Sequence, residues 1–234
     1  MTYTPIIYDW RLGVQPINQV FYGGGLTDSG GLTLAGAEVA LPTPGGRATM
    51  RFEFASLAIT ADNIDASWAI SALRSGRVFR VPLYESVQLV PAADIGLTSG
   101  VLWSLGQSWA NGLGWASNPA AEVQNSWPAG GVTFAARMGP FGAPGTQVLK
   151  IGHVIGFTSG AYDFAHVVMD ISYSGGIATV TIDPPLRRAL VDGNLMRFRP
   201  RMMATCRNAG EVITTFRSGR NIGLGAALFV EALV

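Results

Sequence analysis

Residues 47–54 read RATMRFEF, and apolar and polar side chains alternate along this stretch. Ala48, Met50, Phe52 and Phe54 share one side of an extended chain, while the residues between them are Arg, Thr, Arg and Glu. Successive side chains of a strand point to opposite faces of a sheet, so a repeat of two residues is typical of a half-buried strand. The stretch predicts a strand and a mainly β protein.

The same repeat recurs toward the C-terminus. Ala178, Val180 and Ile182 alternate with Thr and Asp residues. Residues 196–202 read MRFRPRM and alternate apolar residues with three arginines, which we interpret as one strand. Further strands are expected at 78–84, 148–157, 164–173, 212–217 and 227–234.

Turn-forming residues separate these strands at short intervals. Ser159-Gly160, Ser174-Gly175-Gly176 and Asp192-Gly193-Asn194 lie between successive expected strands. The spacing predicts antiparallel hairpins.

One segment differs, because residues 62–75 place apolar side chains at helical spacing, with Asp62 as a possible N-cap and Gly76 just past the end. We expect one flanking helix there.

Four of the six tryptophans lie in a stretch that is rich in Gly, Pro, Asn and Ser. We interpret residues 91–146 as an insertion of short strands and long loops between residues 1–90 and 147–234, which together form one barrel. The indoles either fill a local core or lie exposed at a contact surface, where Trp is a common anchor; stacked sugar is a further alternative. The surface-contact candidates are Trp103, Trp109, Trp115 and Trp127.

The composition excludes some classes of protein. Apolar residues make up 48% of the 234, so the chain is not intrinsically disordered. A single cysteine excludes a disulfide scaffold and a multi-thiolate metal site. The N-terminus lacks a basic stretch followed by an apolar one, and no stretch is typical of a membrane helix. We therefore expect neither secretion by a signal peptide nor membrane insertion.

Charged residues are scarce, at 13% against about 25% in ordinary soluble domains. Of the 16 basic residues, 15 are arginine, which fits extensive subunit contacts but equally fits a GC-rich genome. Residues 187–220 hold eight arginines against Asp192 and Glu211, while the rest of the chain has eight basic and thirteen acidic residues. Opposite charge in two parts of one chain suits head-to-tail contacts between copies, with intramolecular pairing and a nucleic-acid patch as alternatives. The candidates for the subunit interface are Arg187, Arg188, Arg197, Arg199, Arg201, Arg217 and Arg220.

No catalytic pattern stands out. His153 and His166 fall within expected strands without a third metal ligand nearby, and Cys206 has no histidine close in sequence. The glycine clusters lack the context of a phosphate-binding loop. We expect no enzymatic activity, no metal and no cofactor, although the members of a glycosidase carboxylate pair could be distant in the chain.

Two stretches carry a resemblance to a known family. The run from Arg47 to Tyr84 has the expected order strand, helix, strand and ends in the motif SALRSGRVFRVPLYES (residues 71–86). Residues 178–207 read ATVTIDPPLRRALVDGNLMRFRPRMMATCR. With the preceding LKIGHVIGF and HVVMDIS segments, they resemble the distal tail (Dit-like) and related minor tail proteins of long-tailed bacteriophages and phage-like gene transfer agents. The expected insertion lies outside the resemblance.

The resemblance implies a tail-tube-like antiparallel β-sandwich or barrel with one helix, assembled as a hexameric ring at the tail tip of the virion. Such a ring, assembled in the cytoplasm of the host bacterium, joins the tail tube protein to the baseplate hub and lets genome DNA pass through its lumen without sequence-specific binding. The alternatives are a receptor- or carbohydrate-binding tail-tip module, prompted by the tryptophans, and another tail tube or hub ring protein.

Overall fold

The computed structural model describes a mainly β protein, as expected. No helix among the described residues is long and apolar enough to cross a membrane. The described residues are 6–10, 16–24, 26–32, 38–43, 46–54, 56–58, 68, 71–83, 120–138, 147, 149–198, 200–208, 213–217 and 221–232.

Seventeen strands are found in these residues. Their bounds are β1 Ile7–Asp9, β2 Asn18–Tyr22, β3 Leu26–Leu32, β4 Glu38–Thr43, β5 Thr49–Glu53, β6 Ser56–Ala58, β7 Val78–Pro82, β8 Ala120–Gln124, β9 Thr133–Arg137, β10 Val154–Ser159, β11 Tyr162–Ser174, β12 Ile177–Asp183, β13 Leu195–Arg197, β14 Arg201–Cys206, β15 Ile213–Arg217, β16 Asn221–Leu224 and β17 Ala226–Glu231.

The chain divides into two compact units. One contains Met1–Leu83 and Arg201–Val234, and the other contains Tyr84–Pro200. This division differs from the expected boundaries after residues 90 and 146. The reason is strand pairing: residues 120–138 of the expected insertion supply β8 and β9 of a closed barrel, whereas β14 and β17 pair with strands from the N-terminal part of the chain.

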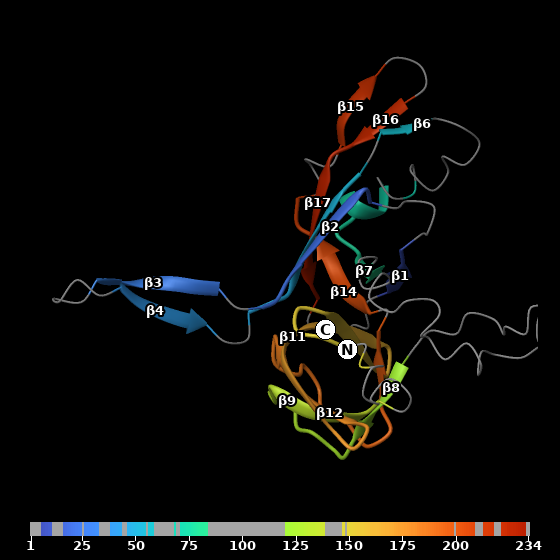
Figure 1. Cartoon of the computed structure of the whole chain (residues 1–234). Helices are drawn as coiled ribbons and strands as arrows, with labels where there is room; N and C mark the ends of the chain where they lie inside the picture. The colour runs from blue at the N-terminus through green and yellow to red at the C-terminus, as the bar shows by residue number, and fades with distance from the viewer. Residues whose placement is uncertain are drawn as a thin grey trace, which may run out of the picture. The chain divides into compact units, whose positions relative to one another are not determined.

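The first unit is built on an open six-stranded sheet in the order β1-β7-β14-β17-β5-β2. Strands from the two ends of the chain lie side by side in it, blue to teal and orange to red in Figure 1. The pairs are antiparallel except β1 with β7, which is parallel. Two smaller sheets, β15-β16-β6 and β3-β4, complete the described strands of this unit.

Aromatic side chains form the core of this unit. Trp10 is buried, and its ring lies 5.5 Å from that of Phe229, 5.9 Å from Phe79 and 6.1 Å from Phe52. In β5, Met50 and Phe52 are fully buried and Arg51 is exposed, as the alternation of residues 47–54 predicts. The edge-to-face geometry of these rings adds to the free energy gained by burying them.

The expected helix is confirmed in the part that is described. Residues 71–74 are helical, and Leu73 is buried. Ser75 donates from its backbone and its hydroxyl to the Ala72 carbonyl, and Gly76 follows with a φ of 64°. A glycine in the left-handed region is the usual end of a helix, because a side chain there would be strained. The expected N-cap at Asp62 lies outside the described residues.

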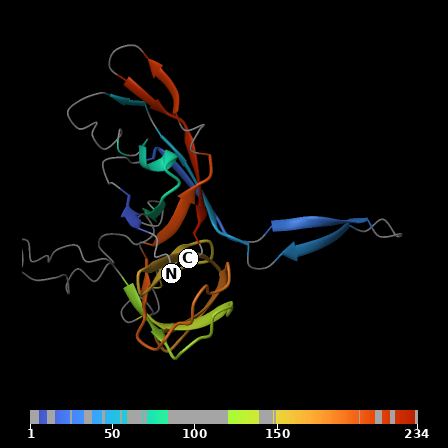
Figure 2. The same ribbon diagram turned by 180° about the vertical axis from the view of Figure 1, so that it is seen from behind.

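The second unit contains a closed barrel of six strands in the order β10-β11-β12-β9-β8-β13. β13 pairs with both β8 and β10, so the sheet closes on itself (Figures 1 and 2). All six pairs are antiparallel. The expected turns at Gly160 and Gly175-Gly176 connect β10 to β11 and β11 to β12, and these glycines have positive φ.

Alternation along the strands fills the barrel. Ala178, Val180 and Ile182 of β12 are buried, while Thr179 is exposed. These three buried side chains pack against side chains from all five remaining strands of the barrel, in one core. The remaining core residues are Ala121, Val123, Phe134, Ala136, Met138, Leu149, Ile155, Phe157, Val168, Leu186, Leu190, Met196 and Phe198.

The interpretation of residues 196–202 as one strand was wrong. Met196 lies in β13 of the barrel, whereas Met202 lies in β14 of the open sheet, and Pro200 separates the two strands. Proline has no N–H to donate to a strand ladder, so it ends the pairing even though the alternation of side chains continues past it. Arg197 and Arg201 consequently belong to different units.

His166 faces the inside of the barrel. It lies two residues before the core residue Val168 in β11 and so points to the same side of the strand. Its ring centroid lies 5.7 Å from that of Phe157, and only 1% of the residue is exposed. Its Nδ1 lies 2.7 Å from the Pro184 carbonyl, which only accepts, so Nδ1 carries the hydrogen. The pKa of His166 is lowered from 6.5 to about 4, chiefly by burial; the bond to the Pro184 carbonyl opposes the shift, and the charge of Arg187 contributes to it.

We predict that Gly156→Ala destabilises the barrel. A Cβ at this position would lie 2.6 Å from Cβ of Pro200 and 3.1 Å from the Phe164 carbonyl oxygen. Overpacking of this kind costs about 1–3 kcal/mol, to be measured by urea unfolding. Ser172→Ala, at an exposed position of β11, is the control and should change stability little. Equal stability of both variants would contradict the close packing of Gly156.

We also predict that His166 makes the protein less stable in acid. In the unfolded chain the imidazole titrates near 6.5, so between pH 6.5 and about 4 the unfolded state binds the proton first. Stability should fall as pH drops through this window, by about 2–3 kcal/mol at pH 4.5.

The measurement is urea unfolding at pH 7.5 and 4.5, with His166→Gln and the half-buried His153→Gln compared with the unchanged protein. His166→Gln should remove most of this part of the pH dependence. His153→Gln should leave most of it, because burial and Lys150 lower the pKa of a histidine that remains partly exposed. An unaltered pH dependence in His166→Gln would contradict the conclusion that the low pKa of His166 causes the loss of stability in acid.

Candidate functional site

The predicted interface arginines are divided between the two units. Arg187, Arg188 and Arg197 belong to the barrel unit, and Arg201 is an exposed residue of β14 in the other. Arg217 lies in β15, but its side chain is not among those described. Arg199 and Arg220 lie outside the described residues. These seven arginines therefore do not form one basic face of one strand.

Two of them, Arg188 and Arg197, contact residues of the hairpin between β10 and β11. The guanidinium of Arg188 lies 3.8 Å from the centroid of the Tyr162 ring. Arg197 donates from Nε to the hydroxyl of Thr158, which in turn donates to the buried carboxylate of Asp163. The positive charge of Arg187 contributes to lowering the pKa of His166 on β11. The structure thus places two of the candidates, Arg188 and Arg197, at this hairpin.

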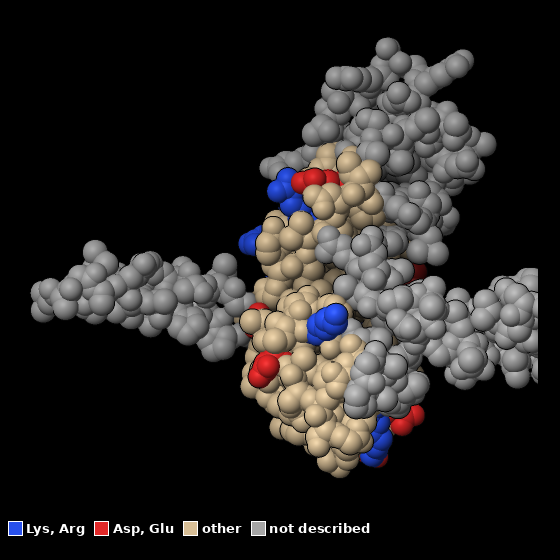
Figure 3. All heavy atoms as spheres, in the orientation of Figure 1, with Lys and Arg blue, Asp and Glu red and all other residues tan. Residues whose placement is uncertain are grey.

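The charge imbalance along the sequence does not separate the two units. The unit with the open sheet has ten basic and eight acidic residues, and the barrel unit has six basic and seven acidic residues. The basic run from 187 to 220 crosses the boundary at Pro200, so it is shared between them. On the face seen in Figure 3, charged side chains form small separated groups among uncharged described residues.

Trp127 is the one surface-contact candidate that the structure describes. It packs partly buried against the barrel core, and its Nε1 donates to the Gln124 carbonyl at 2.7 Å. Its backbone pairs with Leu190 in both directions. These contacts support a structural role within its own barrel. Trp103, Trp109 and Trp115 lie outside the described residues.

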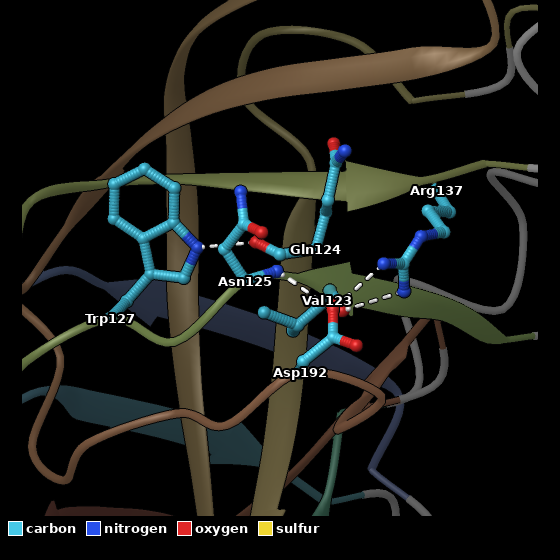
Figure 4. A network of polar contacts seen from close by, with 6 residues as sticks. All are labelled: Val123, Gln124, Asn125, Trp127, Arg137 and Asp192. Atoms are coloured by element: carbon cyan, nitrogen blue, oxygen red, sulfur yellow. Dashed lines mark hydrogen bonds and ion pairs between the residues drawn. The ribbon is translucent and has the colours of Figure 1, made fainter.

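Trp127 adjoins a polar network that ties β8 and β9 to the turn before β13 (Figure 4). Asp192 accepts at 2.8 Å from the Asn125 backbone and at 2.8 Å from the Arg137 guanidinium. These two hydrogen bonds, the backbone one being the larger cause, lower the pKa of Asp192. Asn125 has a φ of 66°, a conformation that asparagine tolerates better than most residues. The network ties β8, β9 and the turn before β13 together at this end of the barrel.

The sequence analysis predicted neither of the two edge strands of the open sheet, β1 and β2. Val20 and Tyr22 of β2 are 36% and 49% exposed, and Ile17, which precedes the strand, is 71% exposed. At the other edge, Ile6 precedes β1 and is 69% exposed. Val, Phe and Tyr in residues 18–22 are residues that strands favour, and this composition could have revealed β2.

In the described part of the chain, no three His, Cys, Asp or Glu side chains lie close enough to hold a metal ion. Cys206 is half-buried, and burial raises the pKa of its thiol. It contacts Asn208, whose side chain bonds to the backbone of Ala226 and Leu228 and so ties β14 to β17.

Comparison with known proteins adds no family. The chain matches no protein-family model, and no curated protein is significantly similar to it. The resemblance to tail proteins therefore depends on the sequence stretches quoted above.

Proposed function

We propose that this protein is a structural subunit of a phage-like tail, a distal-tail protein that forms a ring between the tail tube and the baseplate hub. The quoted sequence stretches suggest the family. The structural observation that carries the proposal is the open sheet, which ends in two unlike strands with exposed apolar residues beside them.

An open sheet edge is a ready template for another strand, because its backbone N–H and C=O groups are unpaired on one side. Among the described strands, β1 pairs only with β7, and β2 pairs only with β5. Contact between two different edges of identical copies is head-to-tail, and such contacts close into a ring when the rotation allows it. The exposed Ile6, Ile17 and Tyr22 would be buried by it.

The resemblance supplies the rest of the proposal. The ring is hexameric, lies at the tail tip of the virion, binds the tube protein and the hub protein, and leaves a lumen for the genome. It needs no cofactor and performs no catalysis. A tube subunit or another hub ring would use the same edges, and the copy number per particle distinguishes these, since tube subunits form many stacked rings.

We predict that the double substitution Val20→Lys/Tyr22→Lys prevents ring formation without unfolding the subunit. Charged lysines on an edge strand oppose strand addition, and both residues are exposed in the single chain. Size-exclusion chromatography with light scattering should show rings for the unchanged protein and monomers for the variant, with similar melting temperatures.

The control is Thr179→Lys, which places the same charge on an exposed position of β12, a barrel strand paired on both sides. It should leave ring formation intact. Rings that persist in the double variant would exclude the β2 edge as the contact, and a protein that is monomeric throughout and absent from purified particles would overturn the proposed function.

A further inference from the structure

We propose that neighbouring copies in the proposed ring join by parallel strand addition, with β1 of one copy beside β2 of the next and Ile6 beside Ile17. This contact rests on the proposed function, because only a head-to-tail ring brings the two unlike edges of the open sheet together. The strand directions and the exposed apolar residues determine which way the strands run and which residues meet.

The two edge strands of the open sheet run in the same direction. β1 is parallel to β7. From β7 to β2 the sheet passes through four antiparallel pairs, namely β7 with β14, β14 with β17, β17 with β5, and β5 with β2. Four reversals restore the original direction, so β2 runs the same way as β1.

The geometry of a ring then fixes the direction of the contact. Neighbours in a six-membered ring differ by a rotation of about 60°, so a strand changes direction by about 60° at most from one copy to the next. An antiparallel pair would need a full reversal. β2 of one copy and β1 of the next can therefore pair only in parallel, as β1 already pairs with β7 inside the subunit.

The exposed apolar residues indicate the register of this contact. Ile6 directly precedes β1 and is 69% exposed, and Ile17 directly precedes β2 and is 71% exposed. They are the two most exposed large apolar residues among those described. When the first residues of the two strands, Ile7 and Asn18, lie opposite each other, the isoleucines before them are also neighbours, about 4.8 Å apart. This register removes both isoleucines from water together.

Neither edge strand has the features that keep an edge from pairing. Edge strands are commonly protected by lysine, proline or a bulge. Residues 18–22 read NQVFY, without charge or proline, and β2 pairs with β5 residue by residue from Asn18 to Tyr22. The one charged residue of β1, Asp9, forms an ion pair at 3.0 Å with Arg80 of the adjacent strand β7. The two edges therefore suit each other as partners.

The test is disulfide cross-linking between copies. With Cys206, the one cysteine of the chain, changed to Ala, the variant Ile6→Cys/Ile17→Cys should form disulfides under mild oxidation by diamide. Non-reducing gels should show a ladder of covalent multimers up to the size of the ring. The two positions adjoin opposite edges of one sheet, five strand spacings or about 24 Å apart, so a disulfide within one copy cannot form.

The matched control is Ile6→Cys/Tyr22→Cys in the same background. Tyr22 is also an exposed residue of β2, but it lies five residues beyond Ile17, or about 16 Å along the strand. This pair should link at least about tenfold more slowly, because a disulfide needs Cα atoms within about 7 Å of each other. Val20→Cys alone tests a two-fold contact of β2 with β2, in which the central Val20 lies opposite itself, and it should give no dimer.

Three results would overturn the parallel contact: faster linking of Ile6→Cys/Tyr22→Cys, dimers from Val20→Cys alone, or rings in which Ile6→Cys/Ile17→Cys does not link. Light scattering on the same samples reports ring formation separately. Rings without the expected link exclude this contact and leave the proposed function intact, whereas a protein that forms no rings excludes both. Melting curves check the fold of each variant, and Cys206→Ser replaces Cys206→Ala as the background if the alanine variant does not fold.

Discussion

The pairing of backbone groups at strand edges is the constraint on which this structure depends. In the barrel unit β13 bonds to β10 on one side and β8 on the other, so none of the six strands is an edge. In the other unit, β1 and β2 end the sheet among the described strands. The same antiparallel chemistry therefore yields one unit that is complete by itself and one whose edges suit a further strand.

Much of the local structure could be predicted from the sequence, because burial of one sheet face imposes a repeat of two. The alternation at 47–54 and 178–183 matches the burial of β5 and β12, and turn glycines such as Gly160 and Gly193 lie where positive φ is needed. A repeat of two says which side of a strand is buried. It does not say which strand is its neighbour, and so the barrel and the open sheet could not be told apart from it.

Residues 196–202 show this limit most clearly. The alternation of apolar residues and arginines continues through Pro200, yet the chain passes from β13 of the barrel to β14 of the open sheet at that point. The signal was present in the proline itself, which cannot donate to a ladder. The same error affected the interpretation of the charge pattern. The basic run is continuous in the sequence, but it is shared by two units that are each close to neutral.

The location of Arg187 and Arg188 follows from a related constraint. Pro184 and Pro185 follow β12 directly, and the chain then needs a connection to β13 that satisfies its own backbone groups. It does so by pairing Leu186 with Gly130 and Gly131, and Leu190 with Trp127. Both anchors are apolar and buried, and Arg188 and Ala189 between them are exposed. The hydrogen bonds that complete the barrel thus also hold the short segment that carries the two arginines.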